Sequence, residues 1–179
     1  RRLTGGGAVM HDQNQFTYSL VIPDSYVPKN IQKSYKYICQ PILDTLKDLG
    51  LDAEFAPLND IILNQQKISG NAQTRKQGVV LQHGTLLLDV DVDLMFRVLL
   101  VPDEKLRDKL VASVKKRVTG INHHLKSDLS FEELSDLMLK KFVDFLSVSQ
   151  VEKINLSELN LDLSEEIAKY QSHTWNFKF

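Results

Sequence analysis

Residues 78–91 constrain the fold more than any other part of the chain, because apolar side chains follow one another there almost without interruption. Such a run predicts a strand in a sheet that is covered on both faces, or is at least deeply buried. Residues 14–22 alternate between apolar and polar side chains, which predicts a second strand with at least one buried face. A sheet should therefore organise the core.

Helices and shorter strands complete the pattern. Residues 30–49 carry apolar side chains at helical spacing, although Pro41 should kink or divide that helix. Short strands are predicted over 53–55, 60–63 and 67–73, and helices over 103–117, after Ser130 and from Ser164. This order predicts an α+β domain in which mixed or antiparallel β-sheets are flanked by helices.

Composition limits the class of protein. A chain of 179 residues can form one domain with a sizeable core. The net charge of -1 offers no basic field to nucleic acid, and no stretch approaches the roughly 18 apolar residues of a membrane span. Cys39 is the only cysteine, which excludes an internal disulfide and favours a reducing compartment. We expect a single cytoplasmic domain over 1–179 that binds neither nucleic acid nor membrane.

The chain opens with two arginines and a glycine triplet, in the order Arg1-Arg2-Leu3-Thr4-Gly5-Gly6-Gly7-Ala8-Val9-Met10-His11-Asp12. Consecutive glycines permit positive φ angles and bring backbone N–H groups close to a ligand, which suits a phosphate or a carboxylate. The arginines supply charge and paired hydrogen bonds to the same anion. From these residues alone, an anion site and a glycine-rich turn beside a solvated basic pair are about equally favoured.

Two further polar segments interrupt apolar strands. Lys67 precedes Ser69-Gly70-Asn71-Ala72, where it could stabilise developing negative charge in a cleft, although an isolated lysine is more often a surface residue. Gln82-His83-Gly84-Thr85 lies inside the apolar run and indicates either ligand-facing side chains or a β-bulge. His123 and His124 are adjacent, so their side chains diverge, and we interpret them as surface-loop residues.

Together these segments resemble the lipoate–protein ligase family, within the wider group of biotin and lipoate ligases. The opening arginine–glycine segment, Asn59-Asp60, Lys67-Ile68-Ser69-Gly70-Asn71-Ala72 and His83-Gly84-Thr85-Leu86-Leu87-Leu88 follow the family's order and approximate spacing. Weaker resemblance continues through 113–119 to Trp175-Asn176-Phe177 and so covers nearly the whole chain. The resemblance implies a catalytic domain of the type found in biotin ligases and class II aminoacyl-tRNA synthetases.

The resemblance also implies two-step chemistry. Lipoate and ATP, with Mg²⁺, would form lipoyl-AMP, and the lipoyl group would then pass to a lysine of a lipoyl-carrier domain. The implied carriers are the E2 subunits of 2-oxo acid dehydrogenases and the H protein of glycine cleavage. A separate C-terminal accessory domain or chain is a further implied partner, and we expect the protein to have a segment preceding Arg1.

Site residues follow from the same resemblance. Lys67 is the implied catalytic residue, which contacts the lipoyl carboxyl group and the α-phosphate. The implied binding residues for ATP and lipoyl-AMP are Arg2, Gly5, Gly6, Gly7, Ala8, Val9, Met10, His11, Asp60, Gly70, Asn71 and Ala72. Lipoate is expected to contact Lys67, Arg2, His11, His83, Gly84 and Thr85. Its tail would lie between the strands around 16–22 and 79–88. Asp60 is the candidate ligand for the Mg²⁺ that accompanies ATP.

Three interpretations of the activity stay open. Octanoyltransferases share much of this pattern, but their cysteine-dependent branch needs a nucleophile in the loop before the lysine element. Residues 53–60 contain no cysteine, so we favour adenylation. The alternatives are a cysteine-independent transferase that uses a preformed acyl donor and a non-catalytic lipoyl-binding module. The non-catalytic module is disfavoured by the presence of Lys67, the arginines and the glycine triplet, because simple binding of lipoate needs no cation at the mixed anhydride of lipoyl-AMP.

Overall fold

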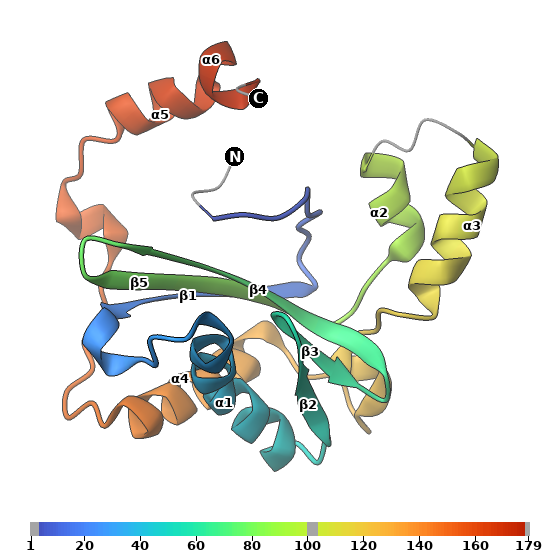
Figure 1. The fold of residues 1–179 in the computed structure, drawn as a ribbon, viewed down its shortest axis with the longest axis horizontal. Helices are drawn as coiled ribbons and strands as arrows, with labels where there is room; N and C mark the ends of the chain where they lie inside the picture. Colours follow the sequence, from blue (N-terminus) through green and yellow to red (C-terminus); the bar gives the residue numbers. More distant parts are fainter. Residues whose placement is uncertain (1–3, 100–103, 178–179) are drawn as a thin grey trace.

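The structure is a computed structural model that describes residues 4–99 and 104–177 (Figure 1). Its five strands form one antiparallel sheet in the order β1-β5-β4-β3-β2. The strands are β1 (Gln15–Pro23), β2 (Ala53–Ala56), β3 (Asp60–Leu63), β4 (Gln66–Lys76) and β5 (Val79–Leu87). The predicted α+β class, with an antiparallel sheet flanked by helices, is confirmed.

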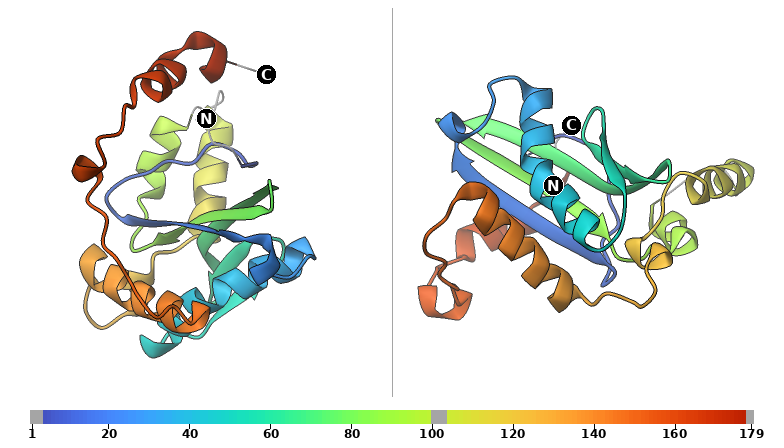
Figure 2. Two further views of the ribbon diagram at one scale, coloured as in Figure 1. Left: turned by 90° about the vertical axis from the view of Figure 1, so that its left-hand side faces the viewer. Right: turned by 90° about the horizontal axis from the view of Figure 1, so that it is seen from below.

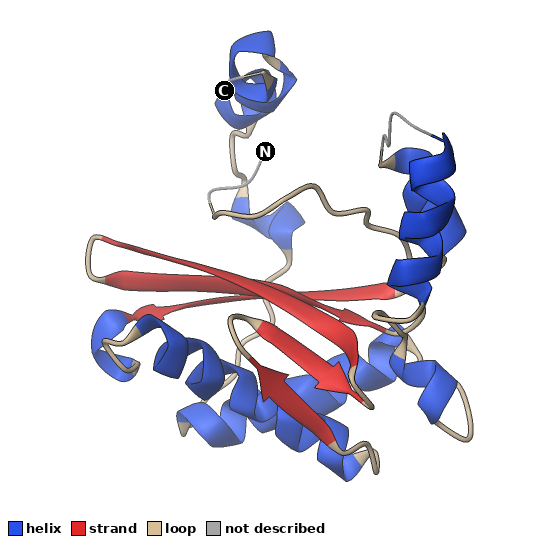
Figure 3. Ribbon diagram, turned by 45° about the vertical axis from the view of Figure 1, so that its right-hand side comes forward, coloured by secondary structure: helices blue, strands red, loops and turns tan. Residues whose placement is uncertain are grey.

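Helices lie on both sides of this sheet. Helices α1 (Ile31–Asp48) and α4 (Phe131–Leu146) pack together beneath one face (Figures 1 and 3). The pair α2 (Val92–Val98) and α3 (Glu104–Lys115) stands at one end of the sheet, and α5 (Ser164–Gln171) and α6 (His173–Asn176) lie on the side opposite α1. The 3-10 helices are η1 (Asp24–Tyr26), η2 (Ile121–His124) and η3 (Leu156–Leu159). Within the described ranges, no helix is long and apolar enough to cross a membrane.

The main core lies between the sheet and helices α1 and α4. Alternate strand residues such as Phe16, Ile61 and Leu86 point into it and are buried. Their partners from the two helices are Cys39, Ile42, Leu46, Leu134 and Met138. Burying one large apolar side chain contributes about 1.5–3 kcal/mol, so this layer fixes which face of each strand turns inward.

The sequence predicts that Pro41 kinks or divides this helix, and the structure shows no division of α1. The helix runs unbroken through this proline, although a proline removes one backbone hydrogen bond. Pro41 is fully buried, and the Thr45 hydroxyl donates a hydrogen bond to the Pro41 carbonyl at 2.8 Å. Burial of Pro41 in the core therefore keeps the parts of α1 before and after the proline in one helix.

The apolar run of 78–91 is also divided differently from the prediction. Strand β5 ends at Leu87, and Asp91 then caps the unpredicted helix α2 by accepting a hydrogen bond from the Leu94 N–H at 2.8 Å. The other helix predictions are confirmed as α3, α4 and α5, and α4 begins with the predicted capping box of Ser130 and Glu133. Val90 therefore lies in the connection after β5 and Val92 begins α2, because an apolar run alone does not distinguish strand from helix.

A buried polar network interrupts the helix-facing side of the sheet. The Tyr18 hydroxyl donates to Asn71 Oδ1 at 2.6 Å and accepts from Gln82 Nε2 at 2.8 Å. Gln82 in turn accepts from Gln73 Nε2 at 2.9 Å. Burial raises the pKa of Tyr18 well above its usual value, so the phenol remains a donor. Buried polar groups destabilise a fold unless they form hydrogen bonds. In this network each of these side chains forms such a bond, and the bonds link β1, β4 and β5.

Gly84 lies inside that network, and its replacement gives a first test. A Cβ at this position would stand 2.2 Å from Asn71 Oδ1 and 2.7 Å from Tyr18 Cε1. Gly84→Ala should therefore lower the free energy of unfolding in urea by about 1–3 kcal/mol. Asn71→Ala removes the obstructing amide, so the same glycine substitution should cost less in that background. An equal cost in both backgrounds would contradict the steric explanation.

Candidate functional site

Most predicted site residues of the strands lie on the sheet face that points away from α1 and α4. Side chains alternate along a strand, so the neighbours of the core-facing residues project to the opposite side. Gly70 pairs with Thr85, and Ala72 pairs with His83. These four predicted residues therefore meet on one surface, which we call the outer face.

The N-terminal segment crosses the outer face (Figure 2). The Thr4 hydroxyl lies 2.6 Å from His83 Nε2 and ties the segment to β5. Residues 5–9 are exposed, and Gly6 has a φ of 116°, which glycine adopts readily. The triplet can therefore present main-chain N–H groups to a ligand held above the sheet.

The other predicted residues of this segment differ in exposure. Ala8, Val9 and His11 are exposed, whereas Met10 is buried. The Asp12 carboxylate then accepts a hydrogen bond from the Asn14 N–H at 2.8 Å and turns the chain into β1. Arg2 lies outside the described residues, so its predicted contact with the nucleotide remains a prediction.

A β-bulge aims Lys67 at the outer face. Lys67 and Ser69 pair with consecutive residues of β3, so Ile68 has no partner there. In a regular strand without a bulge, Lys67 and Ser69 would be two positions apart and would share the core-facing side. The bulge reverses its direction: Ile68 is fully buried, while Lys67 Nζ lies 3.0 Å from the position that a Cβ of Gly70 would take. The absence of a side chain at Gly70 thus leaves room for the ammonium group.

Asp60 holds this ammonium group. Asp60 pairs with Gly70 in the sheet, and its Oδ1 lies 2.7 Å from Lys67 Nζ. The side chains of Lys67 and Asp60 are 41% and 31% exposed, so a ligand can reach the pair. Among the described residues, no group of three or more His, Cys, Asp or Glu side chains could hold a metal ion. In this structure Asp60 forms an ion pair with Lys67, and its role as a magnesium ligand remains a prediction.

Asn71 and Gly84 do not join the outer face, although sequence reasoning placed them in the site. The Asn71 N–H and Nδ2 donate to the Asn59 carbonyl at 3.0 and 2.9 Å, and Asn59 Nδ2 donates back to the Asn71 carbonyl. Asn71 is 4% exposed, and its amide is engaged on the helix-facing side. Asn71 instead holds Asn59, the residue next to Asp60, because the alternation of the strand turns its amide inward.

A distant segment holds the main chain of Lys67. The Lys67 N–H donates to the Arg117 carbonyl at 2.6 Å, and the Thr119 N–H donates to the Lys67 carbonyl at 3.0 Å. Sequence reasoning missed this contact, since backbone pairing between distant residues leaves no spacing pattern. The resemblance that extends through 113–119 was the one signal that could have pointed to it.

Cys39 is placed away from Lys67, in helix α1. It is fully buried and packs in the main core. Burial raises the pKa of its thiol to about 12. A nucleophilic thiolate is therefore not available at this position near neutral pH.

This environment predicts how Cys39 reacts with thiol reagents. At mildly alkaline pH, iodoacetamide should leave Cys39 unmodified in the native protein and modify it fully in concentrated guanidinium. Intact-mass spectrometry measures both outcomes. Rapid alkylation of the native protein would show that the thiol is accessible and reactive.

Comparison with known proteins places this chain in a family. Residues 1–143 match the family model of the lipoyl protein ligase A/B catalytic domain. The chain is 34% identical to octanoyltransferase LipM of Geobacillus kaustophilus, over 99% of this chain and 73% of that protein. It is 32% identical to lipoate-protein ligase LplJ of Bacillus subtilis, over 99% of this chain and 53% of that protein. The chain thus spans about half the length of the second relative.

Solved structures of lipoate and biotin protein ligases also match this chain. A bi-partite lipoate protein ligase from Thermoplasma acidophilum matches with a TM-score of 0.85 and 32% identity, over 98% of this chain and 69% of that chain. Biotin protein ligase from Aquifex aeolicus matches with a TM-score of 0.56 and 12% identity, over 75% of this chain and 53% of that chain, which shows a likeness of fold alone. The predicted biotin ligase-like catalytic fold is confirmed.

Proposed function

Because the chain belongs to the lipoyl protein ligase A/B catalytic domain family, we propose that it is a lipoate–protein ligase. It joins lipoate to ATP as lipoyl-AMP and transfers the lipoyl group to a lysine of a lipoyl-carrier domain. The observation that carries the proposal is the Lys67 ammonium, which the bulge and Asp60 hold on the face crossed by the glycine segment.

In the first step, a lipoate carboxylate oxygen bonds to the α-phosphorus of ATP, and the bond to pyrophosphate breaks. Both reactants are anions, so a fixed cation and main-chain donors stabilise the transition state more than the separate reactants. Lys67 supplies the cation and keeps its proton, and the exposed main chain of Gly5–Gly7 supplies donors. Arg2 is the second cation that we assign to the nucleotide. Mg²⁺ enters with the phosphates of ATP, with Asp60 as its candidate protein ligand.

In the second step, the neutral amine of the carrier lysine attacks the carbonyl carbon of lipoyl-AMP. The bond to AMP breaks, and the attacking amine releases a proton to solvent. Lys67 donates a hydrogen bond to the carbonyl oxygen as its negative charge grows, which is a large effect where water is excluded. The lipoyl tail lies along the outer face of β1 and β5, near His83 and Thr85.

The family comparisons support the choice of partner. The ligase from Thermoplasma acidophilum was analysed together with its E2 lipoyl domain, so we propose an E2 lipoyl domain as one carrier and the glycine-cleavage H protein as another. That ligase is bi-partite, which supports a separate accessory domain or chain as a partner in adenylation. The proposed site of action is the cytoplasm.

Octanoyl transfer is the second candidate, because several similar relatives are named octanoyltransferase. Two observations favour the ligase. The alignment with the Geobacillus octanoyltransferase extends over 205 positions, so at least 26 of them, 205 less 179, have no counterpart in this chain. The alignment with the Bacillus ligase extends over 179 positions and needs almost no such insertion. Cys39, the one cysteine, is also buried and unreactive by its environment.

The acyl donor distinguishes these candidates. Mass spectrometry of an apo lipoyl domain should show lipoylation when the protein is incubated with synthetic lipoyl-AMP, and with lipoate plus ATP and Mg²⁺. Octanoyl-carrier protein should give no modification, because no reactive thiol is available to accept the octanoyl group. Modification from octanoyl-carrier protein alone would overturn the ligase proposal. Modification from lipoyl-AMP but not from lipoate plus ATP would restrict the chain to the transfer step.

The substitution Lys67→Ala tests the central residue. It should lower the rates of both half-reactions by about 10²–10³, the usual cost of one preorganised charge-stabilising donor. Lys141→Ala is a matched control, because Lys141 forms an ion pair of 2.6 Å with Asp48 between α4 and α1, on the other side of the sheet. Thermal unfolding should show that both variants are folded. Near-normal turnover of Lys67→Ala would remove Lys67 from the mechanism.

A further inference from the structure

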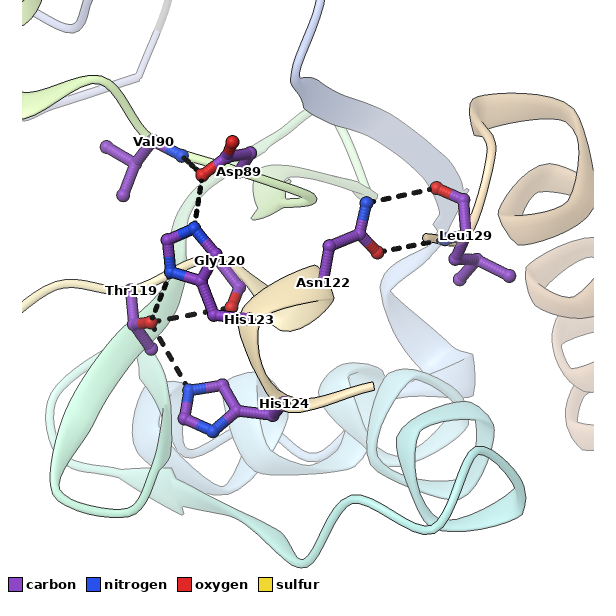
Figure 4. Close-up of polar contacts among 8 residues, drawn as sticks. All are labelled: Asp89, Val90, Thr119, Gly120, Asn122, His123, His124 and Leu129. Carbon is purple, nitrogen blue, oxygen red and sulfur yellow. Dashed lines mark hydrogen bonds and ion pairs between the residues drawn. The ribbon is translucent and has the colours of Figure 1, made fainter. Parts of the chain in front are cut away.

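A chain of side-chain contacts runs from Asn64 to Asp89, and Figure 4 shows its part from His124 to Asp89. Asn64, in the turn between β3 and β4, lies 3.5 Å from His124 Nδ1, and His124 Nε2 lies 3.2 Å from the Thr119 hydroxyl. The same hydroxyl lies 3.5 Å from His123 Nδ1, and His123 Nε2 lies 2.8 Å from Asp89 Oδ1. Both histidine rings therefore contact Thr119, so the prediction that their side chains diverge is wrong. The five residues therefore connect the turn before β4, helix η2 and the residues that follow β5.

The two ends of this chain fix its direction. The amide NH₂ of Asn64 only donates, and the carboxylate of Asp89 only accepts. Each imidazole can bridge its two neighbours when it carries a proton on Nε2 and accepts at Nδ1. His124 then donates to Thr119, and His123 donates to Asp89. The one proton of the Thr119 hydroxyl can be donated to His123 Nδ1 at 3.5 Å or to the Gly120 carbonyl at 3.4 Å. Thr119 is the middle residue of the chain, and it is buried, with 5% of its surface exposed.

Thr119 also holds Lys67 through the main chain. The pairing of β4 with β5 begins at Ser69, so β5 does not reach the peptide groups of Lys67. The segment Arg117–Thr119 takes that place: it accepts from the Lys67 N–H and donates to the Lys67 carbonyl. The bulge can turn Lys67 outward because this segment supplies the missing backbone partners.

The following residues attach the segment to the end of β5. At Gly120 a Cβ would lie 2.5 Å from the Leu88 carbonyl oxygen and from Asp89 Cα, so the two main chains are in direct contact. The Asn122 N–H donates to the Leu88 carbonyl at 3.0 Å, and the Asn122 side chain pairs with the main chain of Leu129 (Figure 4). The segment is therefore fixed on both sides of Thr119.

We propose that the chain Asn64–His124–Thr119–His123–Asp89 is a positioning device for Lys67, with Thr119 as its central positioning residue. It acts through the backbone contacts of Lys67 and does not touch the ligand, so it affects the rate of reaction more than the affinity for substrate. Helix α3 ends at Lys115, immediately before this segment, so the pair α2 and α3 is joined to Lys67 through it. The kinetic part of this inference rests on the proposed function, whereas the structural part does not.

The substitution Thr119→Val tests the device, because valine keeps the shape and removes the hydroxyl on which both halves converge. We expect hydrogen exchange of the Lys67 amide to accelerate about tenfold or more. We also expect kcat for lipoyl-AMP formation to fall about tenfold, while the KM for lipoate stays within about twofold. Thr119→Ser restores the hydroxyl and should resemble the wild type. Unchanged exchange at Lys67 in Thr119→Val, or failure of Thr119→Ser to restore it, would overturn the proposal.

The same substitution in the Lys67→Ala variant distinguishes a positioning role of Thr119 from a general loss of structure. In Lys67→Ala, Thr119→Val should cause no further loss of the residual rate, because there is no ammonium left to position. Equal fold losses in both backgrounds would reject the positioning role. His123→Ala, at an exposed position that also breaks the chain, gives the same test if Thr119→Val fails to fold. If the wild type forms no lipoyl-AMP and transfers no lipoyl group, the proposed function fails, while the exchange measurement still tests the contacts around Lys67.

Discussion

One unpaired residue in β4 decides on which side of the sheet Lys67 lies, and the site depends on that reversal. Ile68 enters the core, where its apolar side chain is stabilised by burial, and the register beyond it is shifted by one position. The hydrogen bonding of the sheet is interrupted at the bulge, because β5 pairs with β4 only from Ser69 onward and leaves the peptide groups of Lys67 without a partner in β5. The segment Arg117–Thr119 compensates by pairing with the main chain of Lys67.

The two faces of the sheet serve different purposes. The face toward α1 and α4 contains the core and the paired network of Tyr18, Asn71 and Gln82, which holds the central strands in register. The outer face carries Lys67 and Asp60 and is crossed by the glycine segment. A paired polar network inside a core favours one register over others, since a slip of one residue would leave its members unpaired. Precise placement of the lysine therefore begins on the face that packs against α1 and α4.

Much of the fold could be predicted because side-chain period and capping are local properties. The alternation in 14–22 and the Ser130–Glu133 capping box each occur in the structure where the sequence predicts them. The predictions were wrong where packing overrides a local preference. Pro41 stays inside a continuous helix because burial and the Thr45 hydroxyl support it. The apolar run beyond Leu87 becomes a short connection and helix α2, since a short apolar run fits either a strand or a helix.

The sequence by itself supplied the order of the candidate residues and, through its resemblance to the lipoate–protein ligase family, the roles expected of them. That resemblance pointed to Lys67, Asp60 and the glycine triplet. The tertiary structure alone decided which of them share a surface. Asn71 follows Gly70 directly, yet its amide turns into the core while Gly70 lies beneath the ammonium, because successive residues of a strand face opposite sides. Thr119 could be found only in three dimensions, since it reaches Lys67 through main-chain hydrogen bonds that any residue type can form.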